Sequence, residues 1–89
     1  MPTDQVIIDL AYHIMDSWRR LGRVLGIEDM VITQIQMDEE DAYERAYMML
    51  NKWRQQMGAG ANYDALAQAL ECKIVGRPDL SQEFCYTMD

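Results

Sequence analysis

The sequence has few of the residues from which metal and redox sites are built. Its 89 residues include one histidine, His13, and two cysteines, Cys72 and Cys85. The cysteines lack the CxxC spacing of a metal or redox motif. Two cysteines are also too few for the disulfide framework of a small secreted scaffold. We therefore expect a reducing compartment, no metal or other cofactor, and no catalytic role for His13.

Basic residues are also scarce. Fifteen Asp and Glu stand against eight Lys and Arg, which gives a net charge of −7. This balance argues against general binding to nucleic acid or to an anionic membrane, although it also fits a surface that merely keeps the domain soluble. No apolar run approaches the roughly 20 residues of a membrane-spanning helix, and the polar residues 1–4 do not open a signal peptide. We expect no direct membrane binding.

Catalytic and ligand-binding motifs are absent as well. The acidic run 38–41 lacks the glycine and the alternating ligands of a calcium loop, and the capping of a helix explains it. Gly58 and Gly60 follow no strand pattern and precede no GK[ST], both of which a phosphate loop requires. Without a paired nucleophile and base, the sequence predicts no enzymatic activity.

What the sequence does contain is a succession of helical patterns. The longest covers residues 38–58, where apolar residues recur at steps of three and four. Asp38 is expected to cap this helix and Gly58 to end it. The apolar positions are Ala42, Ala46, Met49, Leu50, Trp53 and Met57.

Five shorter helices are expected around the long one. They cover residues 3–14 with Thr3 as the cap, a stretch from Asp16 or Ser17 to Gly26, residues near 29–36 after the poor cap Glu28, a stretch from Asn62 to Gly76, and a last helix that begins at Pro78. No segment alternates with period two, as a strand would. The chain is therefore predicted to be one all-α domain of six helices. Because so short a chain buries only about two-thirds of its unfolded surface, partners are expected to matter.

Two positions carry more specific expectations. Gly22 interrupts the second helix at a cost of about 0.5–1 kcal/mol relative to alanine, which favours close approach of another backbone there. Ile74 is expected on the buried side of the fifth helix.

Taken in order, these segments resemble the death domain family. The resemblance is carried by SWRRLGRVLGI at 17–27, the isoleucine pair Ile32 and Ile35, MMLNKWRQQMG at 48–58, NYDALAQAL at 62–70 and VGRPDL at 75–80. It spans the chain from about Leu10 to Phe84. It implies a six-helix antiparallel Greek-key bundle, the death fold, formed by a single domain over residues 1–89 that is a module of a larger protein.

The resemblance also separates structural from binding residues. The positions that match the family core are Trp18, Leu21, Leu25, Ile27, Ile32, Ile35, Leu50, Trp53, Leu66, Leu70 and Leu80. We expect these side chains to pack inside the bundle.

Death domains have no enzymatic activity and join other death domains through several surface patches. The resemblance therefore implies homotypic or heterotypic association and assembly of oligomeric signalling complexes in apoptotic or inflammatory pathways. It implies a cytoplasmic location, either as an adaptor or as the cytosolic part of a receptor. One alternative stays open, namely a structural or autoinhibitory domain that packs within its own larger receptor or scaffold protein.

The family's contact surfaces place the candidate partner-binding residues. One surface carries Arg19, Arg20, Arg23, Glu28 and Asp29, and its counterpart on a neighbouring molecule carries Asp41, Glu44 and Arg45. A second contact mode involves Gln55, Gln56, Lys73, Arg77 and Asp79. The arginines are separated along the chain from the acidic stretch 38–44, which favours head-to-tail contacts between copies.

Overall fold

A computed structural model describes residues 1–86 of the chain. The helices are α1 (Asp4–His13), α2 (Trp18–Val24), α3 (Asp29–Asp38), α4 (Ala42–Met57), α5 (Tyr63–Glu71) and α6 (Pro78–Phe84), with a 3₁₀ turn η1 (Gly58–Gly60) between α4 and α5. No strand forms within the described residues, so the predicted all-α bundle of six helices is confirmed. None of these helices is both long and apolar enough to cross a membrane.

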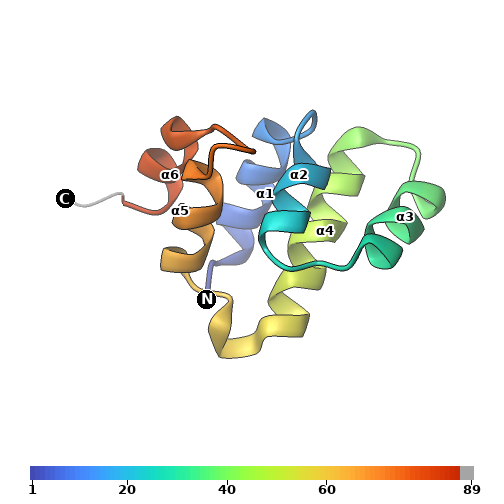
Figure 1. Cartoon of the computed structure of the whole chain (residues 1–89), viewed down its shortest axis with the longest axis horizontal. Helices are drawn as coiled ribbons and strands as arrows, with labels where there is room; N and C mark the ends of the chain where they lie inside the picture. The colour runs from blue at the N-terminus through green and yellow to red at the C-terminus, as the bar shows by residue number, and fades with distance from the viewer. Residues whose placement is uncertain (87–89) are drawn as a thin grey trace.

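Helix α4 is the element on which the bundle is built. It packs against α1, α2 and α3, while α5 and α6 pack against each other and α6 also contacts α1. The molecule measures 40 × 25 × 25 Å, with α3 at one end of the long axis and α6 towards the other (Figure 1). All residues that match the family core are buried, and Trp53 is only 1% exposed.

Several predicted helix ends are confirmed. Thr3 caps α1, because its Oγ1 accepts a hydrogen bond from the Val6 N–H at 3.3 Å. Asn62 caps α5 in the same way, with its Oδ1 2.8 Å from the Ala65 nitrogen. Pro78 is the first residue of α6, and Gly58 ends α4 with φ +53°, which favours glycine.

The start of α4 differs from the prediction. Asp41 is its cap, since Asp41 Oδ2 accepts a hydrogen bond from the Glu44 N–H at 3.0 Å. Asp38 instead ends α3, where its Oδ1 accepts a hydrogen bond from the Gln34 side chain at 2.9 Å. The prediction that Asp38 caps the longest helix was wrong because the acidic run offers more than one residue able to cap, and only the structure decides between them.

Two predicted core positions are also corrected. Helix α5 ends at Glu71, so Ile74 lies in the following turn and is 61% exposed, and Val75 is buried there instead. Met57, at the last turn of α4, is 39% exposed. In both cases the helical period was followed to or past the point where the helix ends, and the side chain there is left partly or largely open to solvent.

The tight approach predicted at Gly22 is present, but side chains make it. A Cβ at this position would lie 3.1 Å from Met49 Cγ and 3.4 Å from Ile32 Cδ1. Glycine therefore lets α4 and α3 pack closely on α2, and the expected contact with another backbone was wrong.

Candidate protein-interaction surfaces

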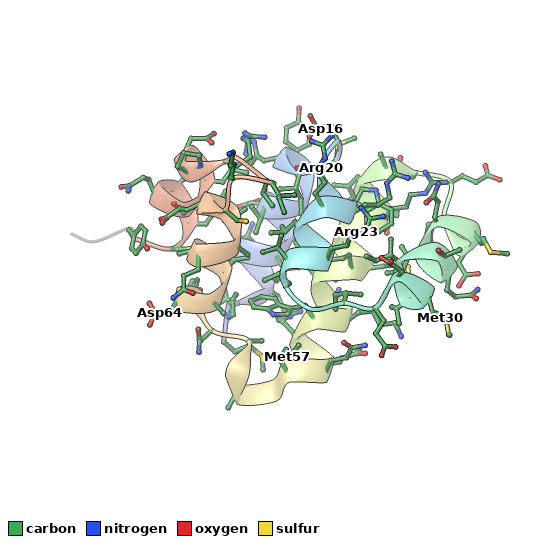
Figure 2. All side chains as sticks on the ribbon, viewed as in Figure 1. Asp16, Arg20, Arg23, Met30, Met57 and Asp64 are labelled. Atoms are coloured by element: carbon green, nitrogen blue, oxygen red, sulfur yellow. The ribbon has the colours of Figure 1, made fainter. Side chains whose placement is uncertain are left out.

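Helix α2 presents three arginines at the surface. Arg19, Arg20 and Arg23 line a polar depression of about 310 Å³ together with Asp16 and Ser17. Figure 2 shows Arg20 and Arg23 one after the other along α2, with Asp16 in the turn that precedes the helix. The buried side of this helix is formed by Trp18 and Leu21 among others, so the amphipathic pattern brings the predicted arginines together. We call this surface the arginine face.

The three arginines differ in their internal partners. Arg23 Nε lies 3.0 Å from Asp29 Oδ1, but both side chains are more than half exposed, so this pair contributes only about 0–1 kcal/mol. Arg19 Nη1 donates to Gln36 Oε1 over a long 3.5 Å. Arg20 is exposed and forms neither an ion pair nor a side-chain hydrogen bond with any residue from 1 to 86. It is the arginine most available to a partner.

Ser17 is an unusual neighbour of the arginine face. It precedes the first residue of α2 but makes no capping hydrogen bond. Its Oγ is buried and has no hydrogen-bond partner among the described residues. An unpaired buried polar group costs about 1–3 kcal/mol. Nothing in the sequence indicates this, since serine is a preferred capping residue before a helix.

The acidic residues near the start of α3 and α4 fall into two groups. Asp29 is paired with Arg23 and Asp41 caps α4, so both carboxylates already have internal roles. Glu28 and Glu44 are exposed, and their side chains form no hydrogen bond or ion pair within residues 1–86. These two carboxylates are free for a partner's cation.

Arg45 is turned towards its own molecule. Its guanidinium donates from Nε to the Glu39 carbonyl and from Nη2 to the Gln36 carbonyl. These bonds fix the connection between α3 and α4. Arg19 also contacts Gln36, so Arg45 lies next to the arginine face. The sequence analysis had instead grouped Arg45 with Asp41 and Glu44, on the counterpart surface.

An aromatic pair, missed in the sequence analysis, lies close to Glu44. The rings of Tyr43 and Tyr47 stack with centroids 6.3 Å apart, and the Tyr43 hydroxyl donates to the Ile8 carbonyl at 3.0 Å. Burial raises the pKa of Tyr43, and the nearby charges of Glu44 and Asp9 raise it further. The i, i+4 spacing of the tyrosines was the available signal. The pair makes the surface around Glu44 partly apolar.

The residues of the second contact mode lie at two ends of the bundle. Gln55 and Gln56 are exposed in the last turn of α4, and Lys73 is exposed in the turn between α5 and α6. Figure 1 shows that α5 runs back from the end of α4, so that these two turns lie far apart. One molecule therefore cannot bring them together, whereas two molecules in contact can.

Arg77, the residue before α6, pairs with Asp79 in the first turn of that helix. Two hydrogen bonds join them, and Arg77 Nη1 also donates to the His13 carbonyl at 3.0 Å. The shared hydrogen bond lowers the pKa of Asp79 and raises the pKa of Arg77. The half-buried ring of His13 packs near Phe84, with centroids 5.9 Å apart. These residues fasten the turn to α1.

Within the described range, no group of three or more His, Cys, Asp or Glu side chains is placed to hold a metal ion. The surfaces above offer free charges, a polar depression and an aromatic pair. Such features suit contact with another protein.

Comparison with known proteins agrees with this architecture. The family model of the death domain matches residues 4–84. The mouse protein named tumor necrosis factor receptor superfamily member 10B is 43% identical over 56 residues, which cover 63% of this chain and 15% of that protein. Mouse THO complex subunit 1 is 37% identical over 68 residues, which cover 76% of this chain and 10% of that protein. The chain thus corresponds to a small part of each relative.

No solved structure gives a significant match to the chain. The family match, however, covers nearly every described residue, and the six helices have the order that the sequence pattern indicated. The chain belongs to the death domain family.

Proposed function

We propose that this domain is a non-enzymatic interaction module that binds other death domains, of its own kind or of a partner protein, and builds oligomeric signalling complexes. Membership of the family supports a role in apoptotic or inflammatory signalling, and similarity to a tumor necrosis factor receptor supports a receptor-linked pathway. The two free cysteines suit the reducing cytoplasm.

The observation that carries this proposal is the unpaired charge of Arg20 on an exposed helix face. Arginine presents a planar fork that can hold a carboxylate through two hydrogen bonds. On a second copy, Glu44 offers such a carboxylate without an internal partner. Because the arginine face and the surface around Glu44 differ, the contact is head-to-tail and repeats from copy to copy.

A fully solvated pair would contribute too little to hold an assembly, since exposed ion pairs are worth only about 0–1 kcal/mol. The stacked rings of Tyr43 and Tyr47 beside Glu44 supply apolar surface. Covering these rings would shield the charge pair from water and strengthen it. The aromatic pair thus supports Glu44 as the centre of the receiving surface.

Light scattering of the 89-residue chain across concentration and salt tests the proposal. At low salt the average mass of the particles in solution should exceed that of a dimer, because a head-to-tail contact does not close at two copies. Added salt should lower this mass again, because it screens the charges. Arg20→Glu should stop the growth. Lys73→Glu changes the net charge equally, but on the second contact surface between α5 and α6. It should not stop the growth if the arginine face makes the contact.

Growth that persists in Arg20→Glu, or that only Lys73→Glu removes, would contradict the proposed surface. A chain that never grows beyond a dimer at low salt would contradict the proposed self-assembly. That second result would favour a domain that packs within its own larger protein.

A further inference from the structure

A groove of about 300 Å³ runs between α3 and α4, at the end of the molecule away from α6 (Figure 1). Its lining residues are Met30, Val31, Gln34, Ile35, Asp38, Met48 and Lys52. None of the three arginines of the arginine face lines it. The groove is therefore a surface separate from the one proposed above.

Met30 is the most exposed large apolar side chain of the described residues. It is 79% exposed at the first turn of α3, and Figure 2 shows it at the outer edge of that helix. A flexible thioether chain of this kind fills irregular apolar gaps well. Together, Met30 and the apolar groove beside it provide both a projecting side chain and a receiving space.

The charged residues of the groove lie at its two ends. Only residues 39–41 join α3 to α4, so Asp38 lies near the start of α4. Lys52 lies ten residues into α4, which is about 15 Å further along the helix. Asp38 and Lys52 are not paired with each other, and Lys52 forms no ion pair within residues 1–86.

This arrangement is complementary to itself. If a second copy is turned by a two-fold axis through the middle of the groove, its Lys52 end meets the Asp38 end of the first copy, and the reverse holds on the other side. Each Met30 then faces the apolar groove of the other copy. We infer that the α3–α4 groove is a two-fold dimer interface, in which a second copy of this chain exchanges Met30 and pairs Asp38 with Lys52 twice.

The dimer is tested in the Arg20→Glu background, so that failure of the arginine face and failure of the groove are distinguished. Sedimentation equilibrium should show a monomer–dimer equilibrium. Met30→Lys should raise the dissociation constant by about ten-fold or more, because an apolar contact of the interface is replaced by charge. Met37→Lys is the matched control, since Met37 is 74% exposed on the same helix but does not line the groove.

Charge exchange tests the two-fold geometry. Asp38→Lys and Lys52→Glu should each weaken the dimer alone, because each places like charges together at both ends. An equimolar mixture of the two variants should restore dimerisation, since both ends then pair opposite charges. The fold should tolerate Asp38→Lys, because a cation suits the C-terminal end of α3.

Three results would overturn the inference: a chain that stays monomeric at millimolar concentration, equal effects of Met30→Lys and Met37→Lys, or a mixture that does not dimerise. If Met30 were shielded from solvent only after a helix of another protein was added to a chain that is itself monomeric, the groove would be the binding site of that partner. A second copy would then be excluded as its occupant.

Discussion

The guanidinium of Arg77 binds the carboxylate of Asp79 through two hydrogen bonds, from Nε to Oδ1 at 3.1 Å and from Nη2 to Oδ2 at 3.0 Å. The same guanidinium reaches the His13 carbonyl at the end of α1. One side chain thus joins the turn before α6 to the first helix. The turn that the sequence analysis assigned to a contact surface is held in a defined shape by this pair.

The pair predicts how stability depends on pH. Its hydrogen bond lowers the pKa of Asp79 below the unfolded value of about 3.9. The ionised carboxylate therefore stabilises the fold above that value, and the contribution is lost as pH falls through the lower folded pKa. Asp79→Asn should be less stable than the original chain at about pH 6, and urea unfolding should show the difference shrinking towards about pH 2. A difference that stays constant with pH would exclude this role.

Trp53 should be the most costly single truncation. Its indole is 1% exposed and belongs to the core cluster, so Trp53→Ala should lower the free energy of unfolding by about 3–5 kcal/mol, out of a total of about 5–15 kcal/mol. Trp18→Ala should act similarly, since Trp18 is buried in the same core. Urea midpoints measured by circular dichroism test both. An unchanged midpoint would place the indole outside the core.

Ser17→Ala should not destabilise the domain. Loss of a serine cap usually costs about 0.5–2 kcal/mol, but Ser17 makes no capping bond and its Oγ is buried without a partner in the described structure. Removing an unpaired hydroxyl should leave the melting temperature unchanged or raise it. Thr3→Ala is the control, because Thr3 does cap its helix and its loss should lower the melting temperature. A similar fall in both variants would show that Ser17 caps α2 in solution.

The thiol of Cys85 should be unreactive near neutral pH. Burial, with a smaller effect of the Glu71 charge, raises the pKa of Cys85 to about 11. In a Cys72→Ala chain, alkylation by iodoacetamide reports on Cys85 alone. Because the thiolate is the reactive form, the rate should still rise about ten-fold per pH unit up to roughly pH 10. A plateau above about pH 9 would contradict the raised pKa.

The sequence was sufficient for the fold because the fold depends on local signals. The steps of three and four that bury Leu50 and Trp53 specify helices, and Thr3, Asn62 and Pro78 specify where they start. The errors fell at helix ends. The path of the turn decides whether Asp38 or Asp41 caps a helix, and whether Ile74 lies inside or outside one. The helical period of the sequence does not predict that path.

The candidate surfaces were less predictable. The sequence located Arg19, Arg20 and Arg23 on one helix, but it could not show that Arg23 is paired with Asp29 while Arg20 has no partner within residues 1–86. It also placed Arg45 with the acidic residues. Internal pairing depends on contacts between helices, so only the folded chain shows which charges are left for a partner.

The proposed assembly is tested most directly by exchanging the charges of Arg20 and Glu44. Asp41 is left unchanged because its carboxylate caps α4. Arg20→Glu and Glu44→Arg should each fail to grow beyond a dimer, because each places like charges at every head-to-tail contact. Unchanged helical spectra would show that both variants are folded.

In an equimolar mixture, the two variants can alternate along the assembly, so that every contact again pairs opposite charges. Light scattering at low salt should then show growth beyond a dimer for the mixture and for the original chain, but for neither variant alone. A mixture that stays as small as its components, or a single variant that grows like the original chain, would contradict the account.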